Sequence, residues 1–176
     1  MKLRISIIGT VLASVLWLGA CVVPAWVNNV ESYGETAAVI AESITDLVDP
    51  ALAPLVTLIA NGFTALVNTL NTYKASPTAT NLQAVQAAFA AVNANVAQLE
   101  SAAQIKNQAT DAKVAAIVQL LAQAVTEIAA QVPAATAARM AALPTVQGQA
   151  QGLKAKDLKR EFNKIVKGDP RFKPLK

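Results

Sequence analysis

The sequence predicts an all-α protein, a bundle of about four to five amphipathic helices, and three observations indicate this class. Ala is abundant and aromatic residues are scarce, which favours packed helices because Ala has the highest helix propensity. Between residues 35 and 147 the only glycine is Gly62. No stretch alternates Val, Ile, Thr or Tyr with polar residues as exposed strands do. The 176 residues suit one domain with appendages.

Residues 1–20 have the three parts of a secretory signal. Lys2 and Arg4 supply positive charge, an apolar run covers residues 5–18, and small residues follow it. The apolar run is about 14 residues long, whereas a membrane-spanning helix needs about 20. The segment therefore indicates export.

Leu18-Gly19-Ala20-Cys21 resembles the lipobox of bacterial lipoproteins, and the resemblance covers residues 1–21 alone. It implies cleavage before Cys21, a diacylglycerol on the thiol of Cys21, and usually a further acyl group on its new amino group. Cys21 is the only cysteine, which suits a thiol occupied by lipid; we expect no other cofactor. Two or more acyl chains hold a protein stably at a membrane. Because Val22 rather than Asp follows, the resemblance favours the outer membrane, facing the periplasm, in a Gram-negative host.

The residues leave one other interpretation of this segment open. An uncleaved membrane helix that continues through residues 22–27 would also be long enough to span a bilayer, despite Pro24. Under the lipoprotein interpretation we expect residues 21–34 to form a tether, because Pro24, the pair Asn28-Asn29 and Gly34 disfavour regular structure there. Trp26 belongs either at the lipid–water interface or against the body.

The first helix is predicted over residues 35–48. Its apolar positions recur at helical spacing, opposite acidic residues that include Glu35, Glu42 and Asp46; they are Val39, Ile40, Ile44, Leu47 and Val48. Asp49 is predicted to cap the next helix, with Pro50 as its first residue.

The second helix, over residues 50–73, carries no charge but has two faces. One face is apolar and the other consists of Thr57, Asn61, Thr64, Asn68 and Asn71. Two such stripes are typical of a half-buried bundle helix, whereas a helix in lipid is apolar all round. A pore lined by the Asn and Thr stripe in an oligomer is the alternative.

Residues 80–132 predict a coiled-coil-like antiparallel hairpin, with one long helix as the alternative. Apolar residues recur at intervals of three and four in both halves, which is the pattern of a coiled-coil seam. In the first half they are Leu82, Val85, Phe89, Val92, Val96 and Leu99; in the second, Val114, Val118, Leu121, Val125, Ile128 and Val132. Gln, Asn and Ala dominate the polar faces, so we expect these helices to contact a second copy or an envelope protein. The bundle extends over residues 35–146, with a short helix over 134–143, and residues 147–152 predict a linker.

Residues 153–176 form a basic tail, with nine Lys and Arg against three Asp and Glu. Its helix, over residues 153–167, is amphipathic, and its cations are Lys154, Lys156, Lys159, Arg160, Lys164 and Lys167. Such a helix is typical of contact with anionic lipid, peptidoglycan or an acidic protein. The alternative is a helix docked on the bundle through Leu158 and Phe162 with solvated lysines. The export signal argues against nucleic acid as a partner.

The residue inventory argues against an enzyme. The chain contains no His, so it has no imidazole to act as a general base near neutral pH. Under the lipoprotein interpretation, lipid occupies the only thiol. Four acidic residues lie near one another in sequence, Glu35, Glu42, Asp46 and Asp49. Such groups can perform acid–base chemistry or bind a hard cation, but a solvated acidic face needs no such role. We expect neither a catalytic nor a metal site.

These patterns together predict a membrane-anchored, non-catalytic helical module for structure or interaction in the cell envelope. Two rivals remain: a protein that handles lipid by opening its helices, and an uncleaved membrane protein that forms a pore or causes lysis.

Overall fold

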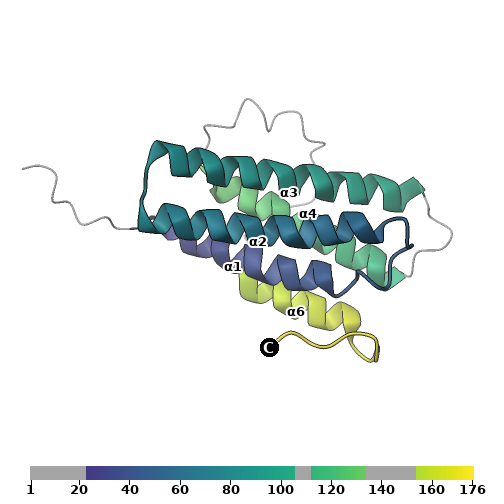
Figure 1. The fold of residues 1–176 in the computed structure, drawn as a ribbon. Coiled ribbons are helices and arrows are strands. Elements are labelled where there is room, and N and C mark those ends of the chain that lie inside the picture. The colour runs from purple at the N-terminus through teal and green to yellow at the C-terminus, as the bar shows by residue number, and fades with distance from the viewer. Residues whose placement is uncertain (1–22, 106–111, 134–153) are drawn as a thin grey trace, which may run out of the picture.

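The computed structural model describes residues 23–105, 112–133 and 154–176, and Figure 1 shows them as a bundle of helices. The described helices are α1 (Ala25–Glu42), α2 (Ala53–Ala75), α3 (Ala79–Ile105), α4 (Ala112–Gln131) and α6 (Ala155–Val166). Within these ranges there is no β-strand. The all-α prediction is therefore confirmed.

Helices α1 to α4 form an antiparallel ring in which each helix packs against two others. α1 contacts α2 and α4, and α3 contacts the same two helices. Contacts between the start of one helix and the end of its neighbour show the antiparallel order. Lys74 near the end of α2 lies 2.7 Å from Glu31 of α1. The Gln86 amide of α3 donates a hydrogen bond to the Pro133 carbonyl, just after α4, at 3.2 Å. Short connections and antiparallel neighbours define an up-down-up-down four-helix bundle.

Helix α6 packs outside this ring, against α1 and α4 (Figure 1). The Nζ of Lys113 at the start of α4 lies 3.4 Å from Asp169, just after α6 ends, so these two helices are also antiparallel. α6 therefore runs in the same direction as α1, and this shorter helix begins beside the middle of the bundle (Figure 1).

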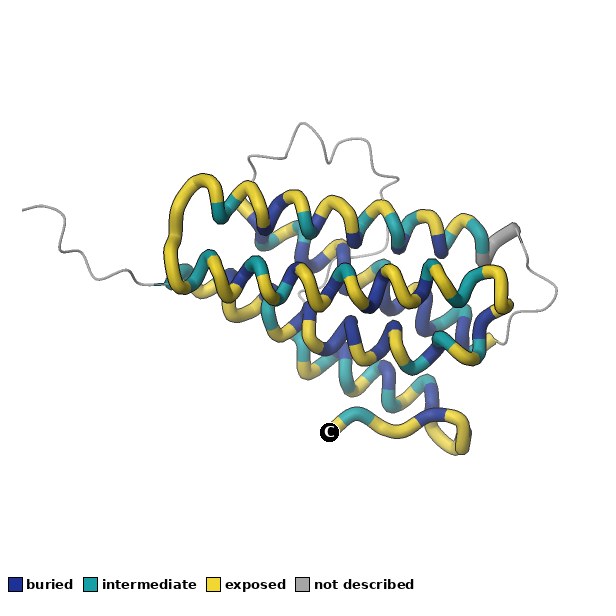
Figure 2. The backbone as a smooth tube through the Cα atoms, in the orientation of Figure 1, coloured by how far each residue is buried: buried dark blue, intermediate teal, exposed yellow. Residues whose placement is uncertain are grey.

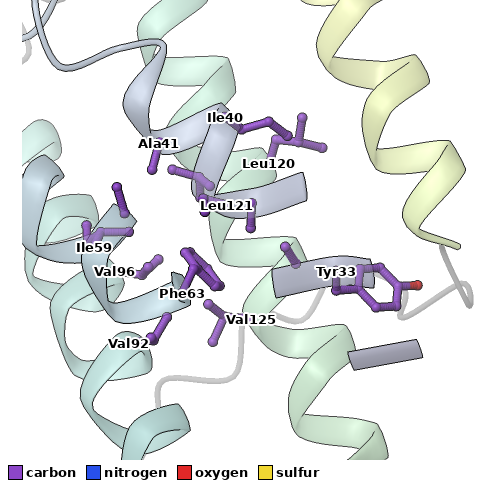
Figure 3. Packing of buried hydrophobic residues seen from close by; sticks show 14 of the residues in the cluster. Tyr33, Ile40, Ala41, Ile59, Phe63, Val92, Val96, Leu120, Leu121 and Val125 are labelled. Carbon is purple, nitrogen blue, oxygen red and sulfur yellow. The ribbon is translucent and has the colours of Figure 1, made fainter. Parts of the chain in front are cut away.

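The core follows the helical period of each segment. Buried and exposed residues alternate along every helix in Figure 2. Phe63 of α2 is completely buried, and Figure 3 shows Val92, Val96 and Val125 around its ring. The apolar face predicted for α2 thus points into the bundle, and its Asn and Thr face points outward.

The expected tether over residues 21–34 is wrong for residues 25–34, which belong to α1. The first helix accordingly runs ten residues earlier than predicted, ends at Glu42 and is followed by turns up to residue 48. Its face is set by Val27, Val30 and Ile40, which are completely buried, while Val39 is 45% exposed on the acidic side. A rotation of about 100° per residue separates Val39 from Ile40.

Gly34 contributed to the prediction of a tether, but in the structure it lies within α1 and faces α2. A Cβ atom at Gly34 would lie 2.8 Å from Cγ2 of Val67 on α2. Glycine is therefore present because α1 and α2 approach closely, and its low helix propensity is offset by packing. Gly62 has the same role between α2 and α3, where a Cβ would meet Cγ2 of Val92 at 2.9 Å.

Gly34→Ala is expected to lower the free energy of unfolding by about 1–2 kcal/mol, because the added methyl forces Val67 out of place. Val67→Ala should cost less stability in the Gly34→Ala background than in the native chain. A double-mutant cycle by urea denaturation measures this coupling. Strict additivity of the two changes would contradict the close approach.

The start of α2 also differs from the prediction. Asp49 does act as a cap, since its Oδ1 accepts a hydrogen bond from the Ala51 N–H at 2.8 Å. It caps a separate turn over residues 49–52, however, and α2 begins at Ala53 with Pro54 in its first turn. Proline at the first helical positions is tolerated at either point, so the sequence did not distinguish them.

The predicted hairpin is confirmed and the single long helix is wrong. α3 and α4 contact each other in antiparallel orientation, as the Gln86–Pro133 hydrogen bond requires. Thr78 caps the start of α3, because its side-chain oxygen accepts a hydrogen bond from the Asn81 N–H at 3.2 Å. The predicted short helix over 134–143 and the linker over 147–152 lie outside the described residues.

Candidate functional site: the end of the bundle near Cys21 and the basic face of α6

The predicted lipobox, Leu18, Gly19, Ala20 and Cys21, lies outside the described residues. The described chain begins at Val23, and α1 begins at Ala25. Only Val22, Val23 and Pro24 therefore separate Cys21 from a packed helix. The folded body starts almost directly after the predicted point of lipid attachment.

The end of the bundle where α1 begins carries an aromatic pair, and we call it the proximal end; it comprises Val23, Pro24, Trp26, Tyr73 and Pro77. The rings of Trp26 and Tyr73 lie 5.8 Å apart, tilted by 33°. Both side chains are half-buried. Aromatic pairs at such separations add about 0.5–1.5 kcal/mol beyond the burial of their area.

An ion pair closes the same end. The ammonium group of Lys74 donates to Oε2 of Glu31 at 2.7 Å, and both side chains are partly buried. This pair joins the end of α2 to the start of α1. It also neutralises the single charge of α2, so the proximal end is locally uncharged on these two helices.

The six predicted cations of α6 form its outer surface, which we call the basic face: Lys154, Lys156, Lys159, Arg160, Lys164 and Lys167. All are exposed except Lys159, which is half-buried. The opposite side of α6 is apolar and buried, because Leu158, Phe162 and Val166 pack against the bundle. The structure therefore shows the docked arrangement, with the lysines directed to solvent.

Acidic residues on α6 partly compensate its cations. Arg160 lies 2.9 Å from Asp157, and Lys164 lies 3.6 Å from Glu161. Exposed pairs of this kind contribute about 0–1 kcal/mol and are screened by salt. The basic face keeps an excess of positive charge, since it presents six cations and two carboxylates.

The last residues of the chain fold back along α6. The Asn163 side chain accepts from the Leu175 N–H at 2.7 Å and donates to the Leu175 carbonyl at 2.8 Å. Phe172 is buried, edge-on to Phe162 with the ring centroids 6.3 Å apart. A shallow cleft of about 420 Å³ lies beside this segment, at the end of the bundle opposite Trp26. The predicted tail is thus a docked element.

Asp169 holds the turn between α6 and this segment. Hydrogen bonds from Arg171, with the nearest at 2.7 Å, lower the pKa of the Asp169 carboxyl well below its usual range. The Nζ of Lys113, on α4, lies 3.4 Å from Oδ2 of the same carboxylate. This ammonium group also lowers the pKa of Asp169. Asp169 therefore links the C-terminal segment to the ring of four helices.

The lowered pKa of Asp169 predicts a loss of stability in acid. The contribution is complete above the unfolded-state pKa of about 3.9 and disappears as the pH falls below it. Asp169→Asn should therefore be less stable than the native protein at pH 7, and this difference should shrink toward pH 3. Urea midpoints at pH 7, 5 and 3 test it. A difference that stays constant with pH would contradict the assignment.

A buried tyrosine lies where α1, α4 and α6 meet. Burial, followed by the charges of Glu127 and Asp157, raises the pKa of the Tyr33 hydroxyl above its ordinary value. Glu127 is itself buried on α4. Figure 3 shows the ring of Tyr33 set apart from the Phe63 cluster. The phenol therefore stays protonated at neutral pH.

The four carboxylates considered for acid–base or cation chemistry are spread along α1 and the turn after it. Glu35, Glu42, Asp46 and Asp49 are all exposed. In the described part of the chain, no three His, Cys, Asp or Glu residues come together as a metal site would require. The sequence grouping is not reproduced as a cluster of metal-ligating groups.

The expected contact surface on the third and fourth helices stays a prediction. α4 packs against α1, α3 and α6, and its exposed residues include Gln119, Gln123 and Thr126. A further free surface lies on the outer sides of α2 and α3 (Figure 2). Its exposed residues are uncharged: Thr57, Leu58, Asn61, Thr64, Asn68, Gln83, Ala87, Ala91, Ala94 and Gln98.

Two described helices, α2 and α4, are long and apolar enough to cross a membrane by length and composition. In the bundle their apolar faces are used for packing, and half of the most apolar stretch of α4 is buried. This permits an association with a membrane but does not require either helix to span it.

Comparison with protein-family models, with curated proteins and with solved structures finds no match to this chain. The chain's own residues therefore define its class. It is an all-α bundle that begins shortly after Cys21 and carries a docked basic helix, α6.

Proposed function

We propose that this chain is a bacterial lipoprotein whose helical body is a non-catalytic structural or interaction module at the membrane. Cys21 carries the lipid, and residues 1–20 are its signal. In a Gram-negative host the module belongs at the outer membrane, facing the periplasm. Partner proteins or a second copy would bind the uncharged outer surface of α2 and α3.

The sequence around Cys21 carries this proposal. The only cysteine follows an apolar run and the residues Leu18, Gly19 and Ala20. The body then begins within four residues, at Ala25. A stably folded domain placed directly after an acylated residue needs no further membrane segment, since two or more acyl chains suffice for anchoring.

Cys21→Ser is expected to abolish lipid attachment and retain the signal. The native protein, extracted from the membranes of a Gram-negative host, should have the intact mass of residues 21–176 plus diacylglycerol and an amide-linked acyl group. The Cys21→Ser protein should show no lipid mass. A native chain that begins at residue 1 or 2, unmodified and unaffected by the substitution, would support an uncleaved membrane helix and disprove the proposal.

A lipid-handling protein is the second candidate, and the apolar character of α2 and α4 favours it. Such a protein would open its bundle and place Phe63 and its neighbours on acyl chains. A protein that begins at residue 22, with neither signal nor lipid, distinguishes the two: a structural module melts cooperatively and does not bind vesicles, whereas a lipid handler binds vesicles without its anchor and gains helix. A pore would in addition make vesicles leak.

A further inference from the structure

The length of chain between Cys21 and the bundle limits which part of the molecule can face the membrane. Three residues, 22–24, lie between Cys21 and Ala25, so the four steps along an extended chain, each at most about 3.6 Å, span about 14 Å. α2 has 23 residues, so the bundle is about 35 Å long. An anchor at or before Cys21 therefore holds the proximal end near the bilayer and cannot reach the other end.

The proximal end has the chemistry of a membrane interface. The tilted rings of Trp26 and Tyr73 lie against each other there and keep part of their surfaces exposed. Aromatic side chains of this kind favour the lipid headgroup region. Pro77 is exposed in the adjoining turn.

The opposite end carries charges of both signs. Glu42, Asp46 and Asp49 are exposed around the connection between α1 and α2, and Lys167, Arg171 and Lys173 are exposed after α6. Charge therefore does not decide between the two ends, and the orientation depends on the short connection to Cys21 and on the aromatic pair.

A bundle lying flat on the basic face is the competing arrangement. It would need apolar residues to enter the interface beside the lysines. On α6 those residues, Leu158, Phe162 and Val166, are buried against α1 and α4. A flat orientation would hence rest on exposed charges alone, and salt would weaken it.

We propose that the proximal end is a bilayer-contacting surface, in which Trp26 and Tyr73 lie in the headgroup region and the bundle stands upright on the membrane. This inference rests on the proposed anchorage at or before Cys21. It directs the opposite end, with the cleft beside Phe172, away from the membrane and toward partners.

Spin labels at two exposed positions test the orientation in the full lipid-bearing chain. Ser76→Cys places a nitroxide in the turn at the proximal end, and Asp46→Cys places one at the far end. In vesicles of phosphatidylethanolamine and phosphatidylglycerol, we expect the label at residue 76 to lie in the headgroup region, protected from a water-soluble nickel complex. The label at residue 46 should be fully accessible to nickel, and 1 M salt should change neither result.

Native fluorescence gives a second readout without a substitution in the body. Trp17 and Trp26 are the two tryptophans, so Trp17→Phe leaves Trp26 alone whether or not the signal is removed. Lipids brominated near the headgroup should quench Trp26 more strongly than lipids brominated at the chain ends. Equal depths of the two labels, or unquenched Trp26, would overturn the upright orientation.

Flotation of the same vesicles separates the two possible failures. A protein that floats with the vesicles but has equal label depths is anchored and lies flat, which contradicts only the orientation. A protein that does not float has no anchor, which contradicts the proposed function and the orientation together.

Discussion

Phe63→Ala is expected to lower the free energy of unfolding by about 3–5 kcal/mol. The Phe63 side chain is completely buried at the centre of the four-helix ring, where residues of α3 and α4 surround it. Its removal leaves a cavity that rigid helices fill only in part, so the loss exceeds the transfer free energy of the ring. Urea denaturation followed by circular dichroism measures the change.

Leu58→Ala on the same helix is the matched control, because Leu58 is 51% exposed. It should change the free energy of unfolding by only about 0.5 kcal/mol, as surface substitutions usually do. Equal effects at the two positions would mean that α2 does not pack with Phe63 inward, and the described bundle would be wrong.

Phe162→Ala is expected to release α6 from the bundle. The Phe162 side chain is completely buried and packs against Phe172 of the C-terminal segment. Among the described helices, α6 contacts only α1 and α4. A loss of about 3–5 kcal/mol of packing free energy at Phe162 therefore removes much of the free energy that holds α6 on these two helices. Hydrogen exchange should become fast in α6 and in residues 168–176, while α2 and α3 stay protected.

Lys164→Ala is the control on the other side of the same helix. The Lys164 side chain is 77% exposed and pairs with Glu161 at 3.6 Å, so its removal should cost less than about 0.5 kcal/mol. If Phe162→Ala opened all helices equally, α6 would belong to a single cooperative unit with the ring. That outcome would contradict its description as a docked addition.

Part of the candidate site could be predicted from the sequence and part could not. The basic face was predicted residue by residue, because charged residues at helical spacing leave one side apolar. Whether Leu158 and Phe162 meet lipid or the bundle was left open, since both environments favour the same apolar residues. The stacked pair Trp26–Tyr73 was missed, because the two residues are far apart in the sequence and meet only through the antiparallel packing of α1 and α2.

The sequence by itself determined the helical class, the inward faces of α2, α3 and α4, and the place of the lone cysteine. These follow from local physics: the 3.6-residue period, the propensity of Ala and the effect of Pro and Gly on the backbone. The tertiary structure decided the start of α1, the exposure of Val39 and the docking of α6. Each depends on a neighbour across the bundle, as Gly34 does on Val67, and one chain segment holds no information about how closely another will approach it.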